Sequence, residues 1–467
     1  YRVVDNPLSS PRAVSVMSNG HYAIMLTATG SGYSMWNGLA VTRWRADPTV
    51  DDGGTHIFLR DTKTGAWWSA APGPRPFDGE QARAVLADEK VEFAKTAGTI
   101  KTKLECLVAT EADAEGRRLT IMNTGSTDRH IEITSYGEFV LSSADSDAAH
   151  PAFSKMFVKT EIGPNGDVIF ARRNKRNHDE PDIEVAHLIV GGSSRAPVQA
   201  ETDRRAFLGR GRELRNAQAF DPGVELQGHQ GFTLDPIFAL RKSIRVPAGK
   251  EATVIFWTMA APDRTTLEAQ VARYRHVENF DHEAQHAWTR SQVQMRHLDT
   301  THAEALLFQR IASYLVYPDT RLRQAQTPGN VVTAPQSALW PLSISGDFPI
   351  FALRIDDEGD LAIVQKAFRM QEYLRARGVI SDLVVINERA SSYAQDVQHA
   401  IDFMCENARR RGLSSGPAQH IFSVRRDLME PATYEALVSA ARILLHTRNG
   451  SISEQIDRLE RMVEEDA

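Results

Sequence analysis

The chain has 467 residues, and its 42% hydrophobic and 24% charged content is typical of a globular protein with a large core. Its 54 basic and 60 acidic side chains are mixed along the chain and give a formal net charge of −6. Because there is no basic stripe, no nucleic-acid partner is expected. At about 150 residues per domain, the length predicts two or three domains.

The two cysteines, Cys106 and Cys405, are too few and too far apart to form a disulfide framework or a zinc site. We therefore expect two core thiols in a reducing compartment and no bound metal. No apolar run approaches the ~18 residues of a membrane span, and residues 1–8 lack the parts of a signal peptide. Because the sequence opens on Tyr1 rather than Met, we interpret it as a piece of a longer polypeptide.

Residues 14 to about 260 have the pattern of one β-strand after another. Apolar and polar residues alternate with period two in runs such as Ile100–Leu104 and Ile131–Ser135. We expect a large antiparallel sandwich, with a last buried strand at Thr253–Trp257. Turn signals separate the strands at Asp52–Gly54, Ala97–Gly98, Asn123–Gly125, Pro164–Gly166, Gly191–Gly192 and Pro247–Gly249.

Near Thr265 the apolar spacing changes to three and four residues, which predicts helices in the rest of the chain. Thr301 and Glu304 form a capping-box pattern, and a proline-containing loop is expected between Pro318 and Pro335. A single apolar run, Asp382–Asn387, is a candidate strand. The predicted helices cover residues 265–275, 281–297, 301–317, 358–378, 391–411, 431–447 and 451–463.

Several aromatic and glycine-rich segments stand out in the sequence: Gly30–Trp36, Leu39–Arg45, His56–Asp61, Trp67–Ser69, His150–Val158 and Arg205–Arg210. They resemble segments in the amino-terminal sandwich of the inverting glycoside phosphorylases, the cellobiose and chitobiose phosphorylase family (glycoside hydrolase family ninety-four). Over essentially its whole length, the chain also resembles the phosphorylase-like region of bacterial cyclic β-1,2-glucan synthases.

The resemblance implies a multidomain fold in which β-structure is followed by α-structure. A large antiparallel β-supersandwich is expected at residues 1–265 and a helical linker at residues 266–317. Residues 318–467 would then be the first part of a truncated (α/α)6 barrel.

The resemblance also implies a reaction, phosphorolysis with inversion. Inorganic phosphate attacks the anomeric carbon while one carboxylic acid protonates the departing oxygen; an inverting hydrolase needs a second carboxylate. In a synthase, this reaction would cleave β-1,2-glucosidic bonds and control glucan length. The implied partners are a β-glucan oligosaccharide, phosphate as co-substrate without another cofactor, the remaining regions of the polypeptide, and a second copy of the chain in a homo-oligomer. The implied location is the cytoplasmic face, as a soluble region of a bacterial inner-membrane protein.

The catalytic acid of the family lies in a Gly-Asp-Trp-Asn-Asp-Gly segment that does not occur in this sequence. We therefore assign no catalytic residue and expect the isolated chain to be inactive. Two alternatives stay open. The region could be a non-catalytic carbohydrate-binding or structural module that supports the glycosyltransferase region, or a fragment of a stand-alone β-glucoside phosphorylase.

The best candidate for sugar binding is the segment Leu339–Pro349. The family carries an Arg-Asp-Ser-x-x-Asp stretch at the barrel mouth, and Ser345 and Asp347 align with its Ser and second Asp, whereas its Arg has no counterpart. Trp340 could stack on a sugar ring; alternatively, Asp347 caps a loop and Trp340 packs beneath it. Trp36, beside glycines in a predicted exposed turn, is a second stacking candidate unless it lies in the core.

Overall fold

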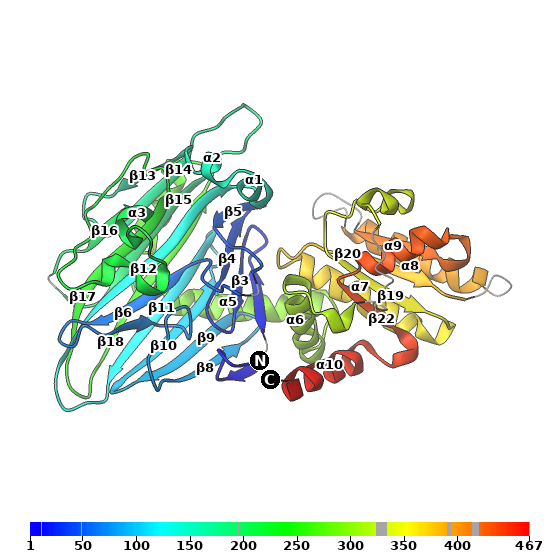
Figure 1. Ribbon diagram of the computed structural model, residues 1–467, viewed down its shortest axis with the longest axis horizontal. Helices are drawn as coiled ribbons and strands as arrows, with labels where there is room; N and C mark the ends of the chain where they lie inside the picture. The colour runs from blue at the N-terminus through cyan, green and yellow to red at the C-terminus, as the bar shows by residue number, and fades with distance from the viewer. Residues whose placement is uncertain are drawn as a thin grey trace. The chain divides into compact units, whose positions relative to one another are not determined.

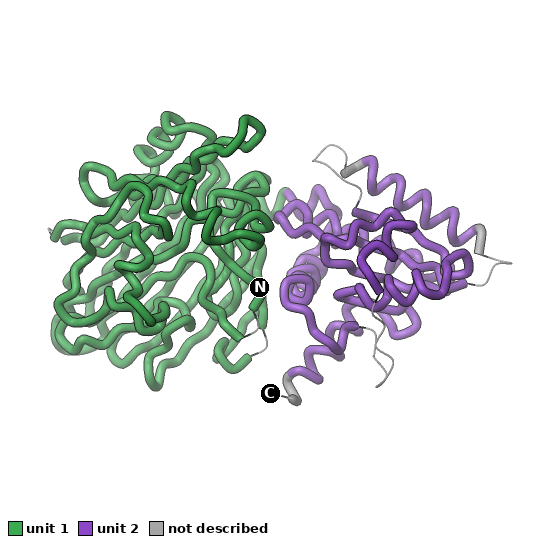
Figure 2. The backbone as a smooth tube through the Cα atoms, turned by 45° about the horizontal axis from the view of Figure 1, so that its top comes forward, with its two compact units in different colours: residues 1–293 green, residues 294–467 purple. Residues whose placement is uncertain are grey.

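The computed structural model describes the chain except for residues 11, 48, 195, 324–333, 390–393, 413–419 and 467. The chain folds into two compact units, Tyr1–Val293 and Gln294–Ala467 (Figure 2). Among the residues described, no helix is long and apolar enough to cross a membrane.

The first unit contains two nine-stranded antiparallel sheets (Figure 1). The first sheet has the order β1 (Arg2–Asp5), β8 (Gln81–Leu86), β9 (Lys90–Ala97), β10 (Ile100–Val108), β11 (Ala114–Asn123), β18 (Glu251–Ala261), β15 (Glu184–Gly191), β14 (Val168–Arg173) and β13 (Val158–Ile162). The second has the order β16 (Gln199–Asp203), β17 (Pro236–Val246), β12 (Arg129–Ser142), β5 (Leu39–Thr42), β4 (Gly32–Trp36), β3 (Tyr22–Thr27) and β2 (Val14–Ser18). In addition, β6 (His56–Asp61) pairs with β12, and β7 (Trp67–Ser69) pairs with β6.

The period-two pattern places one side of each strand in a shared core. In β9, every second residue is buried. The core contains side chains of both sheets, among them Phe93 and Leu104 from the first sheet and Ile133 and Phe238 from the second. The large antiparallel sandwich expected from the sequence is therefore confirmed.

Short helices decorate this sandwich, and two longer ones cover part of the outer face of the first sheet. These are α4 (Arg264–Arg273) and α5 (Asn279–His297). On that face, Trp257 of β18 packs against Tyr274, which directly follows α4, and against Phe280 of α5. The predicted linker at residues 266–317 contains most of α4, all of α5 and α6 (His302–Val316), and the boundary between the compact units falls within α5. The helices are α1 (Ala144–Ala149), α2 (Pro151–Lys155), α3 (Arg204–Leu208), α4 (Arg264–Arg273) and α5 (Asn279–His297), with 3-10 turns η1 (Leu214–Asn216) and η2 (Gln218–Phe220).

The second unit is built on a four-stranded parallel sheet of order β21 (Ile421–Arg425), β20 (Asp382–Asn387), β19 (Ile350–Ile355) and β22 (Ile443–His446). Ala352 pairs with Val384 on one side and Leu444 on the other. The helices are α6 (His302–Val316), α7 (Leu361–Arg375), α8 (Ala394–Gly412), α9 (Pro431–Ala440) and α10 (Ile452–Asp466), with 3-10 turns η3 (Thr320–Leu322), η4 (Gln336–Leu342), η5 (Glu358–Asp360), η7 (Arg426–Leu428) and η8 (Thr447–Asn449).

This sheet corrects the expectation of a truncated (α/α)6 barrel at residues 318–467. Short apolar runs fit a strand as well as a helix, and here parallel pairing with distant segments makes them strands. The helix predicted at residues 431–447 ends at Ala440, and β22 follows it. The candidate strand Asp382–Asn387 is confirmed as β20. The capping box is also confirmed, because Thr301 and Glu304 exchange hydrogen bonds.

Candidate functional site

The glycine-rich segment Gly30–Trp36 lies in the core of the sandwich. A Cβ at Gly32 would lie 1.8 Å from the carbonyl oxygen of Met25, so only glycine fits between these strands. Trp36, at the end of β4, is 6% exposed and donates its indole N–H to Asp113 Oδ2 at 2.7 Å. The predicted exposed turn with a stacking ring at Trp36 is therefore wrong: the glycines permit close strand packing, and this packing buries the ring.

Two further segments behind the resemblance also make structural contacts. Pro151 follows His150 as the first residue of α2, where a backbone N–H is not needed. Phe207, in the segment Arg205–Arg210, is buried and packs against Tyr136 with the ring centroids 4.9 Å apart. Arg204, which directly precedes this segment, donates to Glu138 Oε1 at 2.6 Å. Burial disfavours the Glu138 carboxylate, but Arg204 and Arg43 outweigh burial and lower the pKa of Glu138 from 4.5 to about 2. This cluster ties the short helices to the sandwich.

The sugar-binding residues predicted in the second unit lie together on one exposed loop. Trp340, in η4, is 63% exposed. Gln336 Nε2 donates to the Ser345 carbonyl oxygen and to Asp347 Oδ1, both at 2.8 Å. The Asp347 N–H donates to Ser345 Oγ at 3.2 Å. The loop is thus ordered by its own hydrogen bonds, and it presents an aromatic ring and a carboxylate to solvent.

The position of this loop differs from the barrel mouth that the resemblance implied. It precedes β19 and so lies at the amino ends of the parallel strands, whereas ligands of such sheets usually bind at the carboxyl ends. Asp347 does order the loop, as the alternative interpretation expected. Leu339, which is 3% exposed, packs beneath the loop in place of Trp340.

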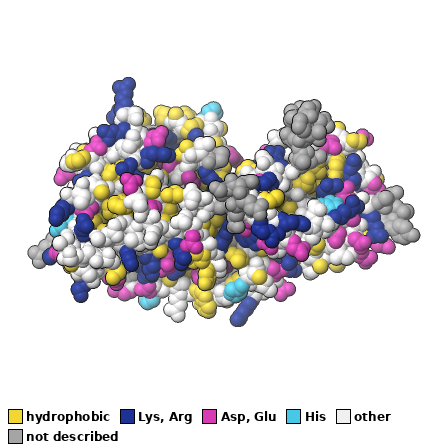
Figure 3. Space-filling view, turned by 60° about the horizontal axis from the view of Figure 1, so that its bottom comes forward, with side chains coloured by type: hydrophobic (Ala, Val, Ile, Leu, Met, Phe, Trp, Pro, Cys, Tyr) yellow, Lys and Arg dark blue, Asp and Glu magenta, His cyan; other side chains and the backbone are white. Residues whose placement is uncertain are grey.

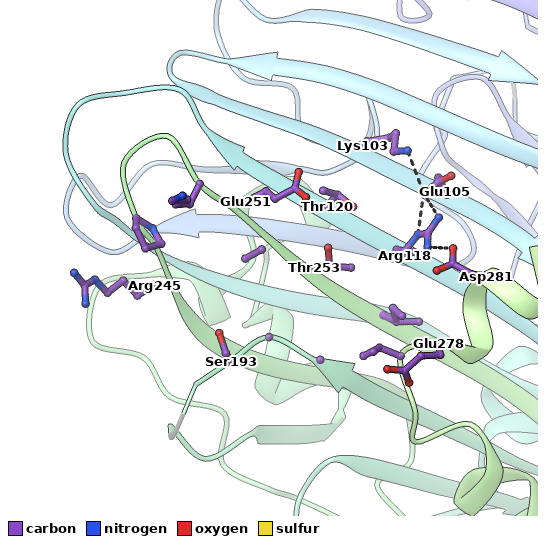
Figure 4. Close-up of a pocket in the computed structure, with 17 residues that line it drawn as sticks. Lys103, Glu105, Arg118, Thr120, Ser193, Arg245, Glu251, Thr253, Glu278 and Asp281 are labelled. Carbon is purple, nitrogen blue, oxygen red and sulfur yellow. Dashed lines mark hydrogen bonds and ion pairs between the residues drawn. The ribbon is translucent and has the colours of Figure 1, made fainter.

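A polar groove lies on the outer face of the first sheet, within the first unit (Figure 4). It has a volume of about 1170 Å³, and β10, β11 and β18 form its floor. Lys103, Thr120 and Thr253 form one row of directly paired residues across these three strands. The walls come from the end of β17 with Arg245 and its connection to β18, from the loop after β15 with Ser193, and from the start of α5 with Asp281.

The groove exists because the outer face of β18 changes character along its length. Ile255 and Trp257 are apolar and belong to the small core that includes residues of α4 and α5. Glu251 and Thr253, on the same face, are polar and line the groove. The alternating sequence contains these polar residues, but only the sheet register and the end of the helical cover bring them together. The alternation within single strands therefore does not predict the groove.

Ion pairs hold the centre of the groove in place. Glu105 is 2% exposed and bonds to Lys90 Nζ and Arg118 Nη2, both at 2.8 Å. Arg118 also forms an ion pair with Asp281, with Nη1 lying 2.5 Å from Oδ1 (Figure 4). Burial opposes the charge on Glu105, but Lys90 and Arg118 outweigh it and lower its pKa. These side chains are thus charged and fixed before any ligand arrives.

Neither the cysteines nor the other metal-binding side chain types form a reactive site among the described residues. Cys106 and Cys405 are buried free thiols, and burial raises the pKa of each to about 12, so neither is a reactive thiolate. Within the described residues, no group of histidine, cysteine and acidic side chains could hold a metal ion. On the face drawn in Figure 3, charges of both signs are interspersed.

The sequence profile of the glycosyl hydrolase 94 supersandwich domain matches residues 1–277, and the chain belongs to this family. It is 60% identical over 458 residues to the cyclic beta-(1,2)-glucan synthase NdvB of Rhizobium meliloti, a match that covers 98% of this chain and 16% of that protein. It is 25% identical over 245 residues to the N,N'-diacetylchitobiose phosphorylase of Vibrio proteolyticus, covering 49% of this chain and 30% of the phosphorylase. A bacterial glucoamylase complexed with acarbose aligns at a TM-score of 0.40 and 7% identity, over 67% of this chain and 42% of the glucoamylase.

Proposed function

We propose that the chain is a non-catalytic, glucan-handling region of a cyclic β-1,2-glucan synthase. The observation that supports this proposal most strongly is the 60% identity to such a synthase over 98% of the chain, which includes both compact units. The chain spans 16% of the length of that relative. The proposed substrate is accordingly the β-1,2-glucan that the complete protein makes.

The non-catalytic role is supported by what the family-like segments do. Trp36 and Arg43, which lie in two of these segments, form internal hydrogen bonds to Asp113 and Glu138, and such contacts are those of a supporting structure. In this proposal, other regions of the same polypeptide supply the catalytic acid for phosphorolysis, with inorganic phosphate as co-substrate and no other cofactor. The complete protein would cleave β-1,2-glucosidic bonds with inversion and so control glucan length. The region would lie at the cytoplasmic face of the inner membrane, where a second copy could bind.

The loop around Trp340 is the sugar contact that we include in this proposal. The supporting observation is its 63% exposed indole ring on a loop that also presents the Asp347 carboxylate. An aromatic face packs on the C–H side of a pyranose, and a carboxylate accepts hydroxyl hydrogen bonds.

The experiment compares the purified chain with the complete protein, each incubated with linear β-1,2-glucan and inorganic phosphate. We expect the complete protein to release glucose 1-phosphate and the chain to release none, because general acid catalysis typically contributes ~10²–10⁴-fold. The chain should nevertheless bind the glucan. Phosphate-dependent turnover that follows the purified chain through chromatography would overturn the non-catalytic assignment, and absence of glucan binding would overturn the glucan-handling role.

A further inference from the structure

The groove on the outer face of the first sheet has a balanced charge. Four cationic side chains and four carboxylates line it, so its formal charge is zero. An anionic ligand would favour an excess of cations, as nucleic-acid and phosphate sites show. Glu105, Arg118 and Asp281 already neutralise one another. This lining therefore favours a neutral ligand.

The uncommitted polar groups of the groove include both donors and acceptors. Thr120, Thr253 and the exposed Glu251 line the floor, and Lys103 Nζ lies 3.4 Å from Glu105 Oε2 while 45% of the Lys103 side chain stays exposed, so its ammonium can still donate to a ligand. A sugar hydroxyl both donates and accepts hydrogen bonds, so a polyhydroxylated ligand matches this mixture. A docked protein would favour an apolar centre, whereas Ile255, an apolar residue of the floor, is 1% exposed.

The polar side chains on the floor of the groove recur at a regular spacing. Lys103, Thr120 and Thr253 are direct neighbours on adjacent strands, which are spaced ~4.8 Å apart. The groove continues past this row to Ser193 and the start of α5 (Figure 4). Repeated polar contacts in an open groove suit a chain of similar units better than one compact molecule.

We infer that this groove is a binding site for a neutral glucan chain and that it holds the polymer against the sandwich. The inference rests on the proposed function, because that function supplies β-1,2-glucan as the polymer. Lys103 and Glu251 provide a donor and an acceptor for the hydroxyls, and the ion pairs around Glu105 keep the floor rigid.

The test titrates the purified chain with short linear β-1,2-glucooligosaccharides by calorimetry. The double variant Lys103→Ala/Glu251→Ala removes one cation and one carboxylate from the groove. We expect its affinity to fall about tenfold or more, because it loses hydrogen bonds to charged groups. The matched control, Lys101→Ala/Glu92→Ala, removes the same charges from the same sheet face outside the groove and should bind as the wild type does.

A second variant removes one hydroxyl from the floor while keeping the shape of the side chain. Thr253→Val replaces the hydroxyl with a methyl group and retains the β-branched side chain that suits a strand, so it should weaken binding several-fold with an unchanged melting temperature. An anionic oligogalacturonide is the comparison ligand and should bind more weakly than the neutral glucan.

The outcomes separate the inference from the function on which it rests. If the wild-type chain binds no β-1,2-glucan, the proposed function itself fails. If the wild type binds the glucan but the groove and control variants bind it equally well, the groove inference alone is wrong. If the wild type binds the oligogalacturonide more tightly than the glucan, and Lys103→Ala/Glu251→Ala weakens that binding, the inference that the ligand is neutral is wrong.

Discussion

The indole N–H of Trp36 donates a 2.7 Å hydrogen bond to Asp113 Oδ2, and this bond joins β4 of the second sheet to the turn between β10 and β11 of the first. The residue that looks most like a sugar platform in the sequence is thus a tie between the two sheets. An exposed ring, Trp340, lies in the second unit instead.

Trp36→Phe should destabilise the first unit without affecting glucan binding. The substitution keeps an aromatic ring but deprives a partly buried carboxylate of a donor, which should lower the free energy of unfolding by about 1–3 kcal/mol. Urea denaturation measures this change. Trp340→Phe is the control and should stay within about 0.5 kcal/mol of the wild type, because an exposed ring has little packing to lose. Equal effects of the two changes would contradict the assignment of Trp36 as a structural tie.

Gly54→Ala should be severely destabilising. Gly54 has a φ of +93°, and a Cβ there would lie 2.3 Å from the carbonyl oxygen of Gly32, so both strain and a backbone clash result. We expect a loss of about 3 kcal/mol or more. Gly38→Ala, at a φ of +82° with open space around the new Cβ, should lose only about 1 kcal/mol from strain. Thermal unfolding of both variants tests the difference, and similar losses would show that the close strand approach is unimportant.

Stability should fall between pH 7 and pH 5 because of two buried histidines. Burial lowers the pKa of His187 from 6.5 to about 3 and that of His56 from 6.5 to about 4. Below pH 6.5 the unfolded chain binds protons that the folded chain excludes, so the stability is fully present above this pH and is lost as the pH falls. Each histidine should account for about 2 kcal/mol by pH 5.

Urea titrations at several pH values provide the measurement. His187→Gln should reduce the pH dependence, whatever it does to stability at pH 7, because the lost group no longer takes up a proton on unfolding. His178→Gln, at an exposed position, controls for the substitution itself. A pH dependence that is the same in His187→Gln and the wild type would argue against a neutral buried imidazole.

Asp347→Ala tests the exposed loop of the second unit as a sugar contact. Two lost hydroxyl contacts to a carboxylate should lower kcat/KM of the complete protein for glucan phosphorolysis by ~10²-fold. Folding should be nearly intact, because Asp347 is exposed. Leu339→Ala, the control, removes a buried side chain and should lose about 2–5 kcal/mol of stability while leaving the kcat/KM of the folded fraction unchanged. Unchanged turnover in Asp347→Ala would leave this carboxylate only the role of ordering its loop.

Elements whose signals are local could be predicted from the amino-acid sequence alone. Period-two alternation predicted the strands of the sandwich, because each strand exposes one side to the core and the other to solvent. The Thr301–Glu304 capping box predicted the start of α6 for a similar reason, since both partners lie within one turn. The apolar run Asp382–Asn387 correctly indicated β20.

Features that depend on partners distant in the sequence became visible only in the folded chain. β19 becomes a strand by pairing with β20 and β22, which lie dozens of residues further along the chain, and that pairing replaced the expected barrel. The burial of Trp36 required the close approach of β3 and β4, and the groove required the register that brings Thr120 beside Thr253. A single sequence shows each strand's own alternation, but hydrogen bonding between strands determines which polar faces become neighbours.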